Sequence, residues 1–390
     1  MKHAMFPKKH RSPLASLLVS GLLLGAPLTS HAGATVSFGE DKSITVGLGL
    51  RASFTSTEDG APNGTSRSKD FNIDSTRLFF SGQLSKTLKG TLNFDRDSTD
   101  TIKVLDAYGQ FEPSPYYNLW VGRHLSPGDR ANMDGPYYLN TATYPGLVSN
   151  FPAKFAGRDD GATFFGRAMD GHLNYAVGAF DGRNKASNLP AGLAATTSNQ
   201  SDSLLYATRV AYHFWDVEPA PAYLTASTYY GAADILTVAV SYQTQKNGVG
   251  TNLIKDDYTA MSADVLMEKR LKAGVLTLEG ATYSYAFSQA AANVDVTKAA
   301  TGIVAGDAYL LGAAFLFPEK VGIGKIQPFV RYQKFEADPG VAVLVTKQSD
   351  IGSHYVIDGF NARLGLTYSN LERTGLKDQN SVILSMQYIY

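Results

Sequence analysis

Charged side chains in the middle of otherwise apolar segments are the residues of this sequence best suited to do chemistry. In segments such as Ser43 to Phe54, every second residue is apolar and the intervening face carries polar or charged groups. Guanidinium groups are always charged and fork onto carboxylate or phosphate oxygens, so such a face could guide anions or form internal ion pairs. The candidates on this face are Arg51, Arg77, Arg167, Arg209, Arg331, Arg363, Asp95, Asp106, Asp264 and Glu279.

A second group of charges lies in the longest stretch without this alternation, His124 to Asp160. The length of the stretch predicts a functional loop, and its aromatic residues and prolines favour packing over disorder. Charges on a loop that narrows a passage can set a preference for one sign of ion. The candidates in this loop are Asp129, Arg130, Asp134, Lys154, Arg158, Asp159 and Asp160.

The remaining polar residues do not indicate catalysis or metal binding. The histidines beyond the N-terminal region are His124, His172, His213 and His354, and they fall in unrelated segments. A nucleophile and its base need to lie within hydrogen-bonding reach of each other. Metal sites favour cysteines or histidines that lie close together, and the chain has no cysteine and no close pair among these histidines. We therefore expect no catalytic residue, no metal site and no cofactor.

The first 32 residues predict a cleaved export signal. A basic start precedes an apolar stretch, Leu14 to Leu28, which is too short to span a bilayer, and small residues then offer a cleavage site after Ala32 or, alternatively, after Ala34. Residues 33–390 show no domain break, so we expect a single domain. Four basic residues leave with the signal, and the remaining 31 basic against 35 acidic residues argue against a nucleic-acid partner.

The alternation predicts an all-β fold with two different environments on the faces of its sheet. Several segments have about the nine to eleven residues with which a tilted strand crosses a bilayer. Charges on one face and apolar groups on the other suit a wet interior and a lipid exterior, whereas strands of soluble sandwiches are shorter. We therefore expect a transmembrane antiparallel β-barrel in contact with outer-membrane lipid.

Connection lengths set the expected strand count. Long connections alternate with short ones, which gives about 16 strands with both ends on the periplasmic side, and 18 strands are the alternative. The segment Ala222 to Gly231 looks like a strand, but counting it would reverse the alternation. We therefore assign Asp216 to Asp234 to a long periplasmic connection. The pair Asp358-Gly359 predicts a two-residue hairpin turn.

The last eleven residues predict the seam of the barrel. Apolar and aromatic residues alternate with more polar ones as far as Tyr390, so this strand is expected to pair with Ser43 to Phe54 and leave no edge in hydrocarbon. The residues expected to face lipid are Val382, Leu384, Met386, Tyr388 and Tyr390.

Several segments resemble, in order and spacing, the phosphate-selective porin O and P family of Gram-negative outer membranes. Among them are TRLFFSGQLSKTLKGTLNFD, RDDGATFFG, RVAYHFWDVEP and VIDGFNARLGLTY. The resemblance implies a homotrimeric 16-stranded porin whose third external loop folds into the pore and whose inward arginines and lysines guide anions. It also implies that the insertion machinery reads an aromatic C-terminal residue, usually Phe, where this chain has Tyr390.

These observations predict a water-filled channel for passive diffusion of ions and small hydrophilic solutes. A preference for phosphate or other anions stays open, because the inner face also carries carboxylates and the loop has a single lysine. A non-conducting barrel that acts as an adhesin or structural protein is the alternative, and an outer-membrane enzyme is the remaining one.

Overall fold

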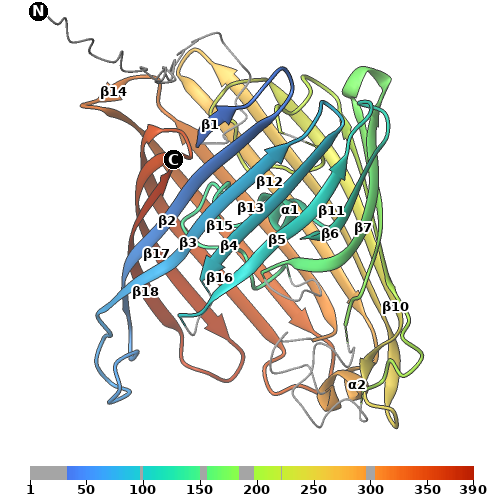
Figure 1. The fold of residues 1–390 in the computed structure, drawn as a ribbon. Helices are drawn as coiled ribbons and strands as arrows, with labels where there is room; N and C mark the ends of the chain where they lie inside the picture. The colour runs from blue at the N-terminus through green and yellow to red at the C-terminus, as the bar shows by residue number, and fades with distance from the viewer. Residues whose placement is uncertain (1–32, 97–99, 150–155, 184–196, 221, 296–303) are drawn as a thin grey trace, which may run out of the picture.

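Sixteen long strands close into one antiparallel barrel (Figure 1). The computed structural model describes residues 33–96, 100–149, 156–183, 197–220, 222–295 and 304–390. The sheet of this part has eighteen strands, of which β1 (Ala34–Ser37) and β14 (Lys320–Val321) are short pieces. The expected 16-stranded barrel is confirmed, and the alternative of 18 spanning strands is wrong. The predicted export signal lies outside the described residues.

The long strands follow one another around the barrel in chain order, each antiparallel to the next. They are β2 (Ser43–Thr57), β3 (Asp70–Gln83), β4 (Leu88–Arg96), β5 (Ile102–Phe111), β6 (Asn118–Leu125), β7 (Arg158–Ala168), β8 (Leu173–Phe180), β9 (Leu205–His213), β10 (Ile235–Gly250), β11 (Lys255–Leu271), β12 (Gly274–Ala286), β13 (Gly306–Leu316), β15 (Gly324–Ala337), β16 (Val345–Asp358), β17 (Ala362–Arg373) and β18 (Gln379–Ile389).

The seam between the last and first long strands is as expected. β18 pairs with β2 over nine positions, for example Ser385 with Ser53, so the sheet has no free edge there. Along β18 the outward Leu384 and Met386 are 51% and 42% exposed, whereas the inward Gln387 is 4% exposed. The alternation therefore separates an apolar outer face from a polar interior.

The two ends of the barrel differ in their connections. We call the end that holds Tyr390 the turn end, and the opposite end, where the connections after β2, β6 and β8 lie, the loop end (Figure 1). In the part of the chain that the structure describes, short helices occur only in connections and at one turn: α1 (Arg130–Asp134), α2 (Gln289–Val294) and a 3₁₀ turn (Met169–Gly171). Among the described residues, no helix is long and apolar enough to cross a membrane.

The turn between β16 and β17 corrects one expectation. Three residues, from Gly359 to Asn361, separate the strands, and the Asn361 amide donates a hydrogen bond to the Asp358 carbonyl at 2.8 Å. The extra residue is Phe360, whose ring lies 5.2 Å from that of Tyr138 and 4.8 Å from that of Tyr230, between ring centroids. Because this ring packs inside the barrel, the turn is longer than the predicted two-residue hairpin.

Two of the described connections fold into the barrel interior. The first, which we call the third loop, has its described residues at 126–149 and 156–157 and carries α1. The second, which we call the inward turn, comprises residues 214–220 and 222–234 between β9 and β10. The expected connection at Asp216 to Asp234 is therefore confirmed, and no strand forms in the described residues of Ala222 to Gly231.

Candidate functional site

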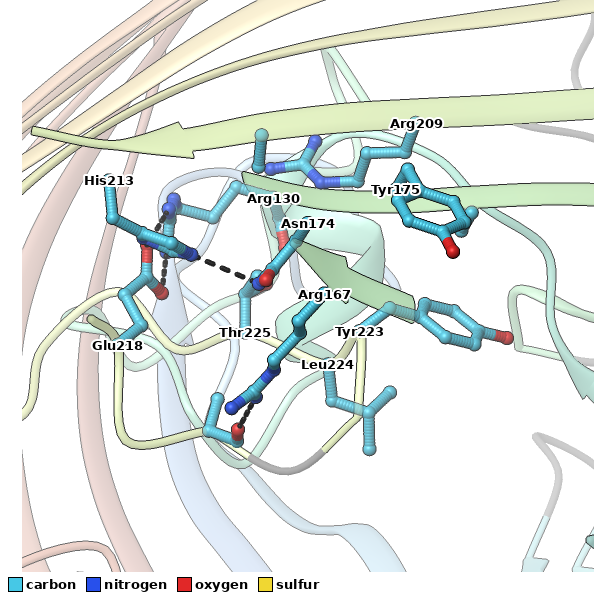
Figure 2. A pocket seen from close by; sticks show the side chains of 13 residues that line it. Arg130, Arg167, Asn174, Tyr175, Arg209, His213, Glu218, Tyr223, Leu224 and Thr225 are labelled. Carbon is cyan, nitrogen blue, oxygen red and sulfur yellow. Dashed lines mark hydrogen bonds and ion pairs between the residues drawn. The ribbon is translucent and has the colours of Figure 1, made fainter. Parts of the chain in front are cut away.

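The third loop and the inward turn are joined by a buried ion pair. Arg130 lies in α1 and is 1% exposed, and Glu218 of the inward turn is 4% exposed. The two guanidinium nitrogens Nη2 and Nη1 donate to the Glu218 oxygens at 2.6 and 3.0 Å (Figure 2). Nη1 also donates to the Ala226 carbonyl at 2.9 Å. Such a bidentate pair fixes both position and orientation, so the two connections form one unit inside the barrel.

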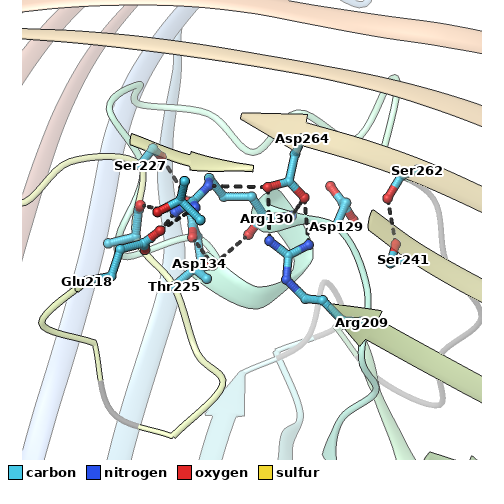
Figure 3. A network of polar contacts seen from close by, with 12 residues as sticks. Asp129, Arg130, Asp134, Arg209, Glu218, Thr225, Ser227, Ser241, Ser262 and Asp264 are labelled. Carbon is cyan, nitrogen blue, oxygen red and sulfur yellow. Dashed lines mark hydrogen bonds and ion pairs between the residues drawn. The ribbon is translucent and has the colours of Figure 1, made fainter. Parts of the chain in front are cut away.

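The same arginine is tied to the wall through Asp264 of β11. Arg209 of β9 donates to both Asp264 oxygens at 2.6 and 2.9 Å, and the Arg130 backbone amide donates to Asp264 at 3.2 Å (Figure 3). Arg209 also donates to the Gly128 carbonyl of the third loop at 2.8 Å. Two arginines therefore share one buried carboxylate, which satisfies charges that would be costly to bury alone.

Burial and neighbouring charges shift the pKa values of the acidic residues that hold the third loop. Burial opposes ionisation of Glu218, but the Arg130 guanidinium outweighs it and lowers the pKa of Glu218 to about 2. Burial raises the pKa of Asp129 to about 6, although Ser149 and Tyr283 each donate a hydrogen bond to it at 2.9 Å. Burial also raises the pKa of Asp134, a carboxylate that accepts from Thr225 and Ser227 of the inward turn.

Glu268 explains why the strand-like segment Ala222 to Gly231 does not add a strand. This β11 residue is fully buried, and its carboxylate accepts from the backbone amides of Tyr229 and Gly231 at 3.0 and 2.8 Å. It also accepts from the Thr228 hydroxyl at 2.6 Å. The backbone donors that a sheet would use are thus taken by one side chain. Sequence reasoning missed Glu268, although it lies four residues after Asp264 on the same inward face.

Most of the predicted inward arginines bind the two inner connections. Their guanidinium groups donate to backbone carbonyl oxygens rather than facing open space, and each lies on a different strand. The contacts run from Arg51 to Ala142 at 2.5 Å, Arg331 to Thr143 at 2.7 Å, Arg363 to Leu139 at 2.6 Å and Arg167 to Ala220 at 2.7 Å. These arginines hold the third loop and the inward turn in place.

Several other predicted charges form pairs along the wall. Arg77 pairs with Asp95 at 3.0 Å, and Arg331 also pairs with Asp350, a residue that sequence reasoning missed, at 2.8 Å. Glu279 is half-buried and borders a cavity of about 10 Å³.

Three residues expected in the loop belong to the wall instead. β7 begins at Arg158, so Arg158, Asp159 and Asp160 are strand residues, because their ladder with β6 extends to Leu125. Arg158 pairs with Asp106 at 3.0 Å, and Asp160 pairs with Arg123 at 2.6 Å. The Asp159 carboxylate accepts from the Gly182 amide at 2.6 Å. Lys154 lies outside the described residues.

The third loop reaches the opposite wall at Tyr137. Its hydroxyl donates to Ser75 at 3.0 Å, and the Arg77 guanidinium carbon lies 4.7 Å from the ring centre. A side chain at Gly49 would place its Cβ only 2.9 Å from the Tyr137 hydroxyl, so this close approach requires glycine. The loop therefore crosses the whole width of the interior.

The inward residues are more buried on one side of the interior than on the other. The inner faces of β9 to β12 are buried beneath the third loop and the inward turn, and the cavities bordered by Arg130 and by Glu279 measure about 20 and 10 Å³, room for roughly one water each. On the inner faces of β2 to β5, neutral polar residues stay partly exposed. They are Ser53, Ser81, Thr91, Asn93 and Gln110.

In the described part of the chain, no group of three histidine, cysteine or acidic residues is arranged to hold a metal ion. The charged interior is instead an internally paired network, and its chemistry is that of ion pairs and hydrogen bonds.

A closed 16-stranded barrel with an apolar outer face and a polar interior defines the architecture of Gram-negative outer-membrane porins and places the chain in an outer membrane. Salmonella typhi OmpF, in complex with daunomycin, matches with a TM-score of 0.58 at 10% identity, covering 90% of this chain and 98% of that one. An anion-selective porin from Comamonas acidovorans matches at 0.56 and 12%, covering 90% and 100%. The trimer form of in-vitro folded OmpT from Vibrio cholerae matches at 0.53 and 14%, also covering 90% and 100%.

These identities make the likeness one of fold. No protein-family model matches the sequence, and no curated protein sequence matches it. In outer-membrane barrels the short turns face the periplasm and the long loops face outward. The turn end is therefore periplasmic and the loop end external.

Proposed function

We propose that the protein is an outer-membrane porin that lets ions and small hydrophilic solutes diffuse passively along the inner faces of β2 to β5. The observation that carries this proposal is the partly exposed row of neutral polar side chains there, opposite the β9–β12 wall, whose inward residues are mostly buried. Neutral hydroxyl and amide groups can exchange hydrogen bonds with a passing solute without binding it tightly. A lane rather than a central pore is thus the proposed route.

Tyr137 sets the narrowest point of this lane in our proposal. It stands between the external row at Ser53 and the periplasmic row at Ser81 and Thr91, and it contacts Ser75 directly. The third loop brings it there, which is the role that the family resemblance implies for this loop. The Tyr137 side chain is fully buried, so the lane is closed at this point in the structure, and our proposal requires the ring to move aside for solutes to pass.

We propose weak ion selectivity instead of a phosphate preference. The cations that border the lane have carboxylate partners: Arg77 pairs with Asp95, and Lys89 pairs with Glu112 at 2.7 Å. The arginines that sequence reasoning assigned to anion guidance are bound to loop carbonyls. Because these charges are neutralised by their partners, they do not strongly lower the energy barrier to entry for either anions or cations. Reversal potentials in a salt gradient near zero, unchanged by added phosphate, are the expected result.

We further propose that the barrel works as a homotrimer inserted through its C-terminal strand. The support is the similar fold of OmpT, which has a trimer form, and the complete pairing of β18 up to Ile389. Light scattering of the detergent-solubilised protein should give three copies per particle. Deleting Tyr390 should slow insertion without changing the fold of inserted barrels.

The lane is tested by cysteine labelling, because the chain has no native cysteine. Thr91→Cys and Asn93→Cys should react with a water-soluble thiol reagent and then reduce the conductance of channels in planar bilayers. Ser241→Cys on β10 is the matched control, since Ser241 is inward but 1% exposed and should stay unmodified. Equal labelling of both walls would contradict the proposed lane.

The alternative is a non-conducting barrel that serves as an adhesin or structural protein. The packing of the interior on the β9–β12 side, with cavities of water size, favours it. The alternative would be supported if the folded protein gave no conductance steps in planar bilayers even though the cysteine sites of the lane were accessible to the thiol reagent.

A further inference from the structure

The outer face of the barrel carries a groove of about 480 Å³ where β13, β15, β16 and β17 lie side by side. Its border is largely apolar and outward-facing, and Leu311 and Ile351 are 57% and 58% exposed. Ala313 is a small outward residue in it, flanked by larger neighbours such as Val330 and Tyr368. The shape and chemistry fit a hydrocarbon chain.

Two lysines stand directly opposite each other beside this groove. Lys334 of β15 and Lys347 of β16 are register partners, and the alternation of their strands turns both outward. Like charges directly across a sheet destabilise it, and here a glutamate lies beside each of the two lysines. Lys334 contacts Glu336 at 2.7 Å and Lys347 contacts Glu372 at 3.7 Å, yet an ammonium group has three donors, so each can bind a further anion.

The position of the lysines along the strands matches the external interface. β15 ends at Ala337 and β16 begins at Val345, so both lysines lie close to the loop end. The next outward residues toward the middle of the strands, Tyr332 and Ser349, already border the groove, about 7 Å away at 3.3 Å per residue. An anionic headgroup at the lysines would therefore leave its chain aligned with the groove.

We propose that this face binds a phosphorylated lipid of the outer leaflet, with its phosphate at Lys334 and Lys347 and an acyl chain in the groove beside Ala313. Paired lysines supply charge and donors for phosphate oxygens, and the groove supplies apolar contact for the chain. This site lies on the outer face of β13, β15, β16 and β17, whereas the proposed solute lane follows the inner faces of β2 to β5, so it does not depend on the lane.

Native mass spectrometry of the full barrel in detergent, titrated with bisphosphorylated lipid A, tests the site. The double variant Lys334→Gln/Lys347→Gln should bind about tenfold more weakly, because charge-assisted contacts are lost. Ala313→Trp should weaken binding by filling the groove while keeping both lysines. Arg123→Gln is the matched control: Arg123 is a cation near the external end of β6, paired with Asp160 and remote from the groove, and its loss should leave binding unchanged.

Two further arms separate the sources of the anion and the possible occupants. Dephosphorylated lipid A should bind more weakly than the bisphosphorylated form, and inorganic phosphate should not displace the lipid, because it lacks the chain. Heat-dependent migration in electrophoresis checks that each variant is folded. Unchanged binding by the folded double variant, equal loss in Arg123→Gln, or cross-linking that shows a second copy of the chain covering Ile351 would overturn the proposal.

Discussion

The β9–β12 wall and the β2–β5 wall carry the same alternation of apolar and polar residues, yet their inner faces lie in different environments. Ser241 of β10 and Asp264 of β11 are 1% and 3% exposed beneath the third loop. Thr91 and Asn93 of β4 remain partly exposed. The strand pattern defines which residues face inward, and the inner connections decide which of those become core.

The kind of polar group explains the difference. The covered wall supplies full charges, Arg209, Asp264 and Glu268, whose burial is tolerated because Arg130 and the inward turn complete their contacts. The open wall offers neutral groups toward the periplasmic end, which are stable in contact with water. Where the open wall does carry charges, as at Arg77 and Asp95, they pair with each other next to Tyr137.

Asp264→Ala should have the largest effect on the difference between the β9–β12 wall and the β2–β5 wall. It leaves Arg209 and Arg130 with one less carboxylate in a buried site, a change that costs about 3–5 kcal/mol. The third loop should then leave the β9–β12 wall, and conductance should rise. Urea unfolding followed by tryptophan fluorescence measures the stability, and planar bilayers measure the current. Asp264→Asn, which keeps the shape, separates charge from packing, and a wild-type loop in Asp264→Ala would show that Asp264 does not hold it.

Glu218→Gln should release the inward turn while leaving the third loop on the wall. The variant loses the charge that pairs with Arg130, at a cost of roughly 2–3 kcal/mol. Hydrogen exchange at residues 222–234 should increase more than exchange at residues 126–134, which Asp264 still holds. Equal increases in both regions would mean that the two connections open together. Lys89→Gln, on the open wall, serves as the control that should change neither region.

Tyr137→Phe should have a smaller effect, confined to the contact with the open wall. It removes the hydrogen bond to Ser75 but keeps the ring beside Arg77, so the expected loss of stability is about 1 kcal/mol. The expected conductance is equal to or slightly above that of the native protein. A fall in conductance would contradict the role of Tyr137 as the narrowest point.

Asp129→Asn should have the smallest effect of these variants. Its effect on the stability of the third loop should be least at acid pH and should grow toward neutral pH. Because burial raises the pKa of Asp129 from 3.8 to about 6, the folded state binds this proton more tightly than the unfolded chain. The stabilisation from the protonated form is complete below pH 4 and is lost as pH rises through 6. The neutral variant should remove this dependence, as measured by hydrogen exchange of residues 126–149 between pH 4 and 7. A slope that persists in the variant would assign it to another acid.

The fold was accessible from sequence because alternation and connection length act locally. Period two in β18 and β2 predicted both the outward residues and the seam, and the parity of long and short connections kept Ala222 to Gly231 out of the barrel wall. The boundary of the third loop was less accessible. Arg158 begins a strand because β6 offers it partners, which is a property of the pairing and not of the local pattern.

The interior was harder to predict because it joins residues distant in the chain. Arg130 and Asp264 were both candidates from sequence, but nothing local indicates that they meet, or that Glu218 completes the pair. The direction of the arginines was correctly inferred from strand parity. Their partners were not, because carbonyl groups of a folded loop leave no mark in the sequence of the strands that bind them.

The pairing of β18 with β2 also sets the order in which the molecule can be made. The first long strand exposes unpaired backbone groups until the last one arrives, and such groups are costly in hydrocarbon. Joining the two ends of so long a chain is the slowest kind of contact to form, since loop closure precedes any gain from pairing. A chain that ends before β18 therefore cannot form a stable barrel in the bilayer. The whole chain must be synthesised before the protein can stay in the membrane.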